Sequence, residues 1–308
     1  MIIEILLLNV LPLYGLILLG FVIGKTLKLD VDPIATIMLY AVLPFVMFGA
    51  TATMSFDADF ILGPLIIAFI SITASSSAYL VSRYIWGKDD KRHNLLGLLG
   101  VSSNATYFGV PIAIALTDTS YLGLYMVMVL PLFMLDCTLS YFFGVRGEFN
   151  TKDSLIRVAK LPIIYGALFG LGFNFLNFDF SSLMLEYWQR FTGTMIILGM
   201  MMIGAALAQM ERFRFDFQFF KAVALMRYIL WPILGLCWVY LDMHYLHVLN
   251  EIIHLFIILI CSCPLAANTV AYAAKLKLFP ALTACMVLIS TLLALGFIPI
   301  MMFIKDLL

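Results

Sequence analysis

The sequence predicts an all-α protein that crosses a membrane many times, and three observations support that fold class. First, 64% of its 308 residues are hydrophobic and only 12% are charged, which is about half the charge that a soluble domain carries. Second, the apolar residues form continuous runs of about 20 residues, the length of helix that crosses a bilayer. Third, these runs do not alternate polar and apolar residues, so helices are expected rather than a barrel of strands.

Ten such runs follow one another, and each is expected to make one membrane crossing. A helix rises about 1.5 Å per residue, so roughly 20 residues cover the hydrocarbon core of a bilayer. Short polar or charged connections separate the runs, and no linker or charge block marks off a soluble domain. The predicted spans cover residues 3–24, 33–53, 60–86, 94–117, 121–145, 161–177, 191–209, 217–241, 250–275 and 279–304.

Charge and cysteine usage indicate lipid, and no nucleic acid, as the surroundings of this chain. The 18 basic and 18 acidic residues give a net charge of zero, so no overall field attracts nucleic acid. The five cysteines lie inside apolar runs without the spacing of metal ligands, and neither a metal nor a cofactor is expected. The first run lacks the basic start of a cleaved signal, so we expect it to remain in the mature protein.

The basic residues predict the orientation, because Lys and Arg near span ends are retained on the cytoplasmic side. Of the 18 basic residues, all except Arg190, Arg227 and Lys305 lie in or beside the connections after the first, third, fifth, seventh and ninth spans. Those connections are therefore expected inside the cell. Both termini are expected outside.

Weak internal similarity indicates that five spans are followed by five in the opposite orientation. The segment LPLYG at 11–15 corresponds to LPIIYG at 161–166, an offset of 150 residues. Pro111 and Pro264 lie at matching depths of the fourth and ninth spans, although other prolines have no counterpart. We therefore predict two inverted repeats, residues 1–150 and 151–308. Such repeats are typical of transporters whose sites lie where broken helices meet.

The fourth span contains polar and helix-breaking residues at the expected depth of the bilayer centre. Pro111 lacks a backbone donor and Gly109 is conformationally loose, so an uninterrupted helix is disfavoured. Broken backbone exposed to lipid costs several kcal/mol per unsatisfied group, so it must be buried in protein or line a watery cavity. A simple proline kink is the alternative. The candidate residues of this break are Ser103, Asn104, Tyr107, Gly109 and Pro111.

The ninth span repeats the pattern with Pro264, Asn268 and Thr269. Proline is preferred at the first position of a helix, so Pro111 and Pro264 are predicted to begin second half-helices. Two half-helix N-termini would then converge from opposite directions, and their partial positive charges favour an anion. We expect no basic side chain at this site. A sodium site built from carbonyls and amides stays open as the alternative.

The segment SNATYFGVPIAIAL of the fourth span resembles the signature of the auxin efflux carrier family, in which an Asn precedes an aromatic residue, a Gly and a Pro. The resemblance extends over nearly the whole chain, including LPFVMF at 43–48 and CPLAANTVAYA in the ninth span. The connection at 145–160 is short, so the chain is similar to compact bacterial members of the family, among which malonate and malate permeases occur.

The resemblance implies a fold shared with bile-acid symporters and a location in the bacterial inner membrane. It implies a scaffold of spans 1, 2, 6 and 7 and a transport domain of spans 3–5 and 8–10, with substrate at the crossing of spans 4 and 9. Asn104, Gly109 and Pro111 carry over as crossover residues of the first half. Pro264 carries over as the crossover residue of the second.

Asp136 is the one carboxylate deep in a predicted span, and Arg227 lies at a matching depth of the eighth span. A buried ionisable group in a membrane is costly and is a candidate for function. We expect the two to form a structural ion pair. A direct role in coupling transport to an ion, or separate solvation of the two groups, are the alternatives.

Four polar residues near the start of the ninth span are spaced three, four and three apart: His244, His247, Glu251 and His254. This spacing would align them on one helical face at the outer edge of the membrane. An interfacial polar face is the simpler interpretation, and a site that binds a transition metal or titrates is the other. Their role stays open.

These features predict a secondary transporter of small organic anions, carboxylates above all, that works by alternating access. A sodium-coupled symporter on the same architecture is the alternative. We expect no enzyme, because HExxH, GxGD and similar motifs are missing from the spans, and no channel, because no ring of like charges is visible. Substrate identity, transport direction, coupling ion and oligomeric state, a homodimer included, stay open.

Overall fold

The computed structural model describes residues 2–29, 31–53, 59–87, 89–144, 156, 160, 162–209, 215–266 and 268–308. In this part of the chain every regular element is a helix. Six helical runs are long and apolar enough to cross a membrane: Pro33–Ala52, Ile61–Trp86, Arg92–Leu116, Ser182–Ala208, Phe217–Leu246 and Pro280–Asp306. Shorter apolar helices accompany them. The protein is therefore an all-α, multi-pass membrane protein, as predicted.

The chain divides into two compact units that interleave along the sequence. Unit 1 comprises Met1–Phe60, Thr106–Met128 and Ala159–Gln209, and unit 2 comprises Ile61–Ala105, Val129–Val158 and Met210–Leu308. Each unit is thus assembled from three separate segments. The boundaries of these units differ from the boundary at residue 150 between the predicted repeats. The units are defined by packing, whereas the repeats are predicted from similarity within the sequence.

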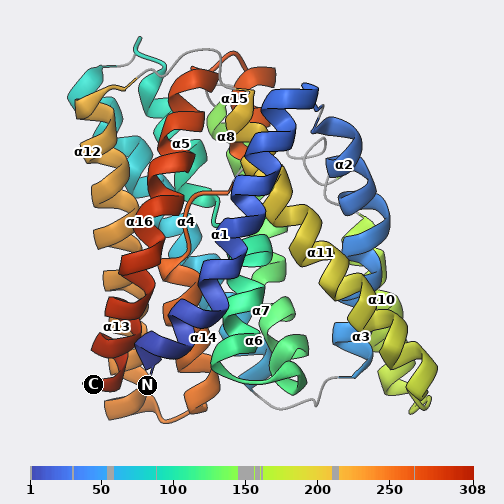
Figure 1. The fold of residues 1–308 in the computed structure, drawn as a ribbon. Coiled ribbons are helices and arrows are strands. Elements are labelled where there is room, and N and C mark those ends of the chain that lie inside the picture. The colour runs from blue at the N-terminus through green and yellow to red at the C-terminus, as the bar shows by residue number, and fades with distance from the viewer. Residues whose placement is uncertain are drawn as a thin grey trace. The chain divides into compact units, whose positions relative to one another are not determined.

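Unit 1 is built around two closely packed helix pairs, α1 with α11 and α3 with α10 (Figure 1). Small residues allow the close approach. A Cβ atom on Gly204 of α11 would overlap the backbone oxygen of Ile17 in α1, and one on Gly166 of α10 would overlap that of Pro44 in α3. The helices of unit 1 are α1 (Ile2–Leu27), α2 (Asp32–Ile37), η1 (Met38–Val42), α3 (Leu43–Ala52), α6 (Val110–Leu116), η3 (Thr119–Tyr121), α10 (Pro162–Phe175) and α11 (Ser182–Ala208).

The helix α11 begins well before the predicted start of the seventh span at 191. Ser181 caps it by accepting a hydrogen bond from the backbone N–H of Met184 at 3.3 Å. Glu186 and Arg190, whose charges lower the local hydropathy, form an ion pair one helical turn apart. The two charged residues that set the predicted start of the seventh span thus lie inside a continuous helix.

Unit 2 contains the half-helices α5 and α14, and nearly every side chain of both is buried. Helices that are apolar all round are expected in such interior positions. The elements of unit 2 are α4 (Asp59–Trp86), α5 (Arg92–Val101), η4 (Asp136–Ser140), α8 (Tyr141–Gly144), α12 (Phe217–Leu225), η5 (Met226–Leu230), α13 (Trp231–Leu241), η6 (Asp242–Leu246), α14 (Glu251–Ser262), α15 (Asn268–Lys275) and α16 (Pro280–Asp306). The helix α7 (Leu122–Leu135) and the π-helix η2 (Ala105–Gly109) contribute to both units.

An ionic network fixes the start of α5 outside the apolar spans. Arg92 pairs with Asp90 at 2.6 Å and with Asp216, which caps α12, at 3.0 Å. The hydrogen bonds from Arg92 hold the pKa of the Asp90 carboxyl below its ordinary value. The guanidinium also lies over the ring of Trp86, 4.9 Å from its centroid. The buried half-helix therefore starts from a defined position.

Candidate functional site

The first interruption lies earlier in the fourth span than Pro111. The helix α5 ends at Val101, residues 102–104 are not helical, and a π-helical turn resumes at Ala105. Serine and asparagine hydrogen-bond to nearby backbone and are therefore poor residues for a helix interior. Pro111 lies in the first turn of α6, as expected of a helix start, but several residues beyond the actual break.

The second interruption separates α14 from α15. The helix α14 ends at Ser262, the backbone is extended at Cys263 with ψ of 148°, and α15 begins at Asn268. The prediction that Pro264 begins the second half-helix is therefore wrong, because Pro264 lies inside the break. It acts instead by lacking the N–H that would bond to the carbonyl of Ile260, four residues earlier.

The two interrupted segments meet through direct hydrogen bonds. The backbone N–H of Asn104 donates to the carbonyl of Pro264 at 2.9 Å. The hydroxyl of Ser103 donates to the carbonyl of Ile260 at 3.1 Å, which supplies the donor that the proline withholds. Both bonds lie within unit 2. We call this junction of residues 102–104 with residues 260–264 the crossover.

Side chains from other helices of unit 2 satisfy the end of α5. A helix leaves its last carbonyls without partners from the next turn. The indole N–H of Trp231 donates to the carbonyl of Gly100 at 3.1 Å, and the hydroxyl of Ser71 donates to that of Val101, also at 3.1 Å. Sequence reasoning missed both donors, because nothing in an apolar run reveals which distant carbonyl a Trp or Ser will contact.

Arg227 from η5 is the cation of the crossover, although the sequence predicted a site without a basic side chain. Its Nε donates to the carbonyl of Cys263 at 2.6 Å, and its Nη2 donates to the hydroxyl of Ser103 at 2.6 Å and the carbonyl of Ile260 at 3.1 Å. The guanidinium lies 4.4 Å from the centroid of the Trp231 ring. The side chain is fully buried.

Two buried donors at the crossover have no hydrogen-bond partner in the described part of the chain. One is Nη1 of Arg227, and the other is the amide Nδ2 of Asn104. A buried donor without an acceptor costs about 1–3 kcal/mol, and more when it is charged. Such groups call for an explanation, and a bound ion or ligand with acceptor oxygens is one.

The predicted ion pair between Asp136 and Arg227 is not present. Asp136, the first residue of η4, accepts hydrogen bonds from the hydroxyls of Ser102 at 2.5 Å and Ser140 at 3.2 Å, and from the amide of Asn268 at 3.4 Å. The two charges instead contact adjacent serines of the first break. Ser102 contacts the carboxylate and Ser103 contacts the guanidinium.

The remaining predicted residues of the fourth span belong to unit 1. The ring of Tyr107 packs against Gly199 of α11, where a Cβ atom would lie 2.5 Å from it. Gly109 is the residue before α6 and has ordinary helical backbone angles, φ −76° and ψ −38°. Pro111 lies in the first turn of α6, after the π-helical turn with which the second half-helix begins at Ala105.

Asn268 and Thr269 of the ninth span have different surroundings. Asn268 is exposed, apart from its contact with Asp136. Thr269 is buried and its hydroxyl donates to the carbonyl of Ala266 at 2.6 Å, a local bond that stabilises the first turn of α15. Of the two, Asn268 is therefore the side chain that remains available at the break.

The four residues His244, His247, Glu251 and His254 do not form one helical face, so that prediction is wrong. His247 has left-handed backbone, with φ of 50°, and it separates η6 from α14. His244 stacks on Tyr240 within the earlier helix. Among the described residues, no group of three or more His, Cys, Asp or Glu side chains is arranged to hold a metal ion.

Asp242, which sequence reasoning missed, is the partner of His254. Its carboxylate accepts from the backbone N–H groups of Val248 and Leu249, both at 3.1 Å, and lies 2.9 Å from Nε2 of His254. The carboxylate therefore ties the connection between η6 and α14 to the start of α14. Its position at the end of a long apolar run gave no sign of this role.

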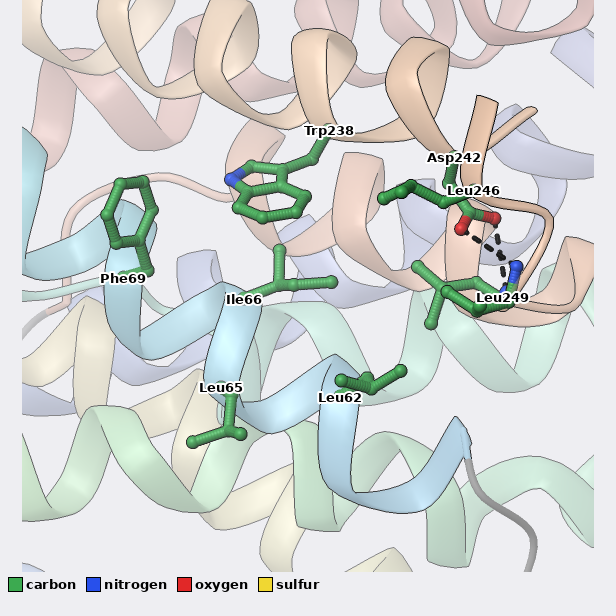
Figure 2. A pocket seen from close by; sticks show the side chains of 9 residues that line it. Leu62, Leu65, Ile66, Phe69, Trp238, Asp242, Leu246 and Leu249 are labelled. Carbon is green, nitrogen blue, oxygen red and sulfur yellow. Dashed lines mark hydrogen bonds between the residues drawn. The ribbon is translucent and has the colours of Figure 1, made fainter. Parts of the chain in front are cut away.

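A separate pocket of about 280 Å³ lies beside this connection, between α4 and the end of α13 (Figure 2). Figure 2 shows the Asp242 carboxylate directed at the backbone nitrogen of Leu249. The carboxylate of Asp242 is thus already bonded. The lining residues are Leu62, Leu65, Ile66, Phe69, Trp238, Asp242, Leu246, Val248 and Leu249. Apart from Asp242 and the indole N–H of Trp238 the lining is apolar, so the pocket offers few groups that would orient a polar ligand.

Comparisons with models of known families and with curated proteins give no match to this chain. The site is therefore interpreted from its own geometry. It combines a buried guanidinium, a free amide and interrupted backbone in a membrane protein, and these groups can hold an anion.

Proposed function

We propose that the protein is a secondary transporter of small organic anions, carboxylates above all, which binds its substrate at the crossover and works by alternating access. The two unpartnered donors, Nη1 of Arg227 and Nδ2 of Asn104, are the observation that carries this proposal. A carboxylate has two oxygens and accepts from both kinds of donor, and a bond to a guanidinium is roughly twice as strong as a neutral one.

The helical architecture supports the proposal. The six long apolar helices and the shorter apolar ones fall at the positions of the ten predicted spans. The fourth and ninth of these are both interrupted, which agrees with two inverted repeats. We therefore propose the five-plus-five organisation and, on the residues quoted from the fourth span, membership of the auxin efflux carrier family.

The two compact units support alternating access. Unit 1 contains the helices of the first, second, sixth and seventh spans, the predicted scaffold. Unit 2 contains those of the third, eighth, ninth and tenth spans and the first half of the fourth, most of the predicted transport domain. We propose that unit 2 holds the substrate and moves as one body. We further propose a bacterial inner membrane location with both termini outside.

Counterflow in proteoliposomes tests the transport proposal. The purified protein is reconstituted in vesicles loaded with unlabelled acetate, lactate, malonate or succinate, and uptake of the same labelled acid is measured. At least one acid should exchange rapidly, while lactamide, the neutral analogue of lactate, should not compete. Lack of exchange for every acid of the panel, or equal competition by lactamide, contradicts the proposal.

Two asparagines of the fourth span provide a matched pair of variants. Asn104→Ala removes an unpartnered buried amide at the crossover, and Asn94→Ala removes one in the buried helix α5, away from it. We expect Asn104→Ala to abolish exchange and Asn94→Ala to retain it, at equal expression and equal elution as a single species. Retained exchange in Asn104→Ala would remove Asn104 from the site.

A further inference from the structure

Asp136 is a buried carboxylate whose partners at the crossover are all neutral. It is 9% exposed, and its hydrogen-bond donors are Ser102, Ser140 and Asn268. The ion pairs among the described residues do not include it. An ionised carboxylate in these surroundings is costly, and the cost disappears when the group binds a proton.

Arg227 is the charged residue that contacts the neighbouring serine of the break. Asp136 accepts from Ser102, and Arg227 donates to the adjacent Ser103. The other charged or titratable residues on the elements packed against Asp136 are Arg92 and His93 in the first turn of α5, Tyr141 in α8, and Tyr272 and Lys275 in α15. The hydrogen-bond partners of the carboxylate are Ser102, Ser140 and Asn268, and Arg92, His93 and Tyr272 are not among them.

The sum of charges at the crossover therefore depends on one proton. With Asp136 ionised, its negative charge and the positive charge of Arg227 cancel. With Asp136 protonated, the crossover has a net charge of plus one, which favours an anion at the unpartnered Nη1 of Arg227. Binding of the proton and binding of the anion then favour each other. The proton leaves a net positive charge that attracts the anion, and the bound anion cancels that positive charge.

We propose that Asp136 carries the coupling proton, so that the transporter moves one proton together with each carboxylate substrate. The inference rests on the proposed function and names its coupling ion. A proton binds the carboxylate on the side where the anion enters, and both leave on the other side. For a monocarboxylate the loaded crossover is electrically neutral, and a membrane potential neither drives nor opposes the step.

The geometry favours a proton over a metal cation at Asp136. Hard cations take about six or more oxygen ligands at about 2.0–2.6 Å. Here the carboxylate oxygen accepts a hydrogen bond from the hydroxyl of Ser102 at 2.5 Å, so a donor already occupies it. The third partner, Asn268, directs its N–H donor at the carboxylate, and a donor repels a cation.

The experiment uses proteoliposomes in sodium-free buffer with the pH dye pyranine trapped inside, and the acid of the panel that exchanges fastest. Addition of that acid outside should acidify the lumen of vesicles that contain the wild-type protein. The lumen of empty vesicles should acidify only at the slower rate of passive diffusion of the acid. An outside pH lower by one unit should drive about tenfold accumulation of a monocarboxylate, because one proton moves with each anion.

Asp136→Asn imitates the protonated carboxyl permanently. We expect it to retain counterflow, and to lose both the acidification of the lumen and the accumulation driven by pH. Asp136→Glu should restore both. Asp118→Asn, which changes an exposed carboxylate that caps η3, is the matched control and should couple like the wild type.

Three results would overturn the inference. The first is a wild-type protein that shows counterflow but, in the dye experiment, acidifies the lumen no faster than empty vesicles do. The second is accumulation that follows a sodium gradient in place of a pH gradient, and the third is accumulation driven by pH in Asp136→Asn that is faster than in empty vesicles. The wild-type measurements decide the matter even if the variant does not fold. Failure of the wild type to exchange any acid rejects the proposed function, whereas exchange without proton movement rejects only the coupling.

Discussion

Arg227→Met tests whether the buried guanidinium holds the crossover together. Methionine keeps an unbranched apolar stem beside Trp231 but removes the charge and the bonds to Cys263, Ser103 and Ile260. Hydrogen bonds to a charged group contribute about 1.5–3 kcal/mol each, so three of them contribute roughly 4.5–9 kcal/mol. The desolvation of a buried ion offsets several kcal/mol of this. We therefore expect a net loss of about 2–4 kcal/mol in the free energy of unfolding.

Equilibrium unfolding in detergent, followed by tryptophan fluorescence, measures this loss. Arg190→Met is the matched control, because Arg190 pairs with Glu186 at an exposed position where ion pairs contribute about 0–1 kcal/mol. Arg227→Lys should lie between the two, since it keeps the charge but not the planar fork of donors. If Arg227→Met is as stable as Arg190→Met, the guanidinium does not organise the crossover.

Three further predictions concern packing, helix ends and surface charge. Gly204→Leu should destabilise the protein by about 1–3 kcal/mol, because the new side chain would overlap the α1 backbone. Gly193→Leu in the same helix has open space around it and should not destabilise the protein. Equal stability of the two variants would refute close α1–α11 packing. Trp231→Phe should cost about 1 kcal/mol in unfolding free energy by removing the donor to the end of α5, and no loss would show that this bond contributes nothing. Asp90→Asn should lower the thermal midpoint at neutral pH, because Arg92 depresses the pKa of Asp90 and the ionised carboxylate stabilises the fold above its ordinary pKa of 3.8. The difference in midpoint from the wild type should vanish as pH falls below the depressed pKa. A difference that persists in acid would contradict the assignment.

The positions of the helix breaks show how accurately local sequence predicts an interruption. Polar residues and prolines located both breaks to within a few residues, because an interrupted helix in an apolar environment requires such residues nearby. The finer placement failed at both prolines that were expected to begin half-helices. Pro264 lies inside the break, and the helix has already resumed at Ala105, before Pro111. Where the helix stops depends on which carbonyls find donors from elsewhere, as Gly100 does from Trp231.

The pairing of charges was beyond local reasoning. Matched depth suggested that Asp136 and Arg227 bind each other, but depth fixes one coordinate of three. The structure directs them to adjacent serines, and Arg227 reaches Ser103, 124 residues away in the sequence. In the same way, the spacing of the histidines assumed an unbroken helix, and the left-handed residue His247 interrupts it.

The sequence by itself determined the solvent of this protein, its helical class and the regions where its helices break, because these depend on composition and on residues within a turn or two of each other. Only the tertiary structure decided that a buried guanidinium lies at the crossover, that the Asp136 carboxylate bonds to the neighbouring serine, and that two donors there have no acceptor in the described part of the chain. Hydrogen bonds act over about 3 Å, and only the folded chain brings residues more than a hundred positions apart to that distance.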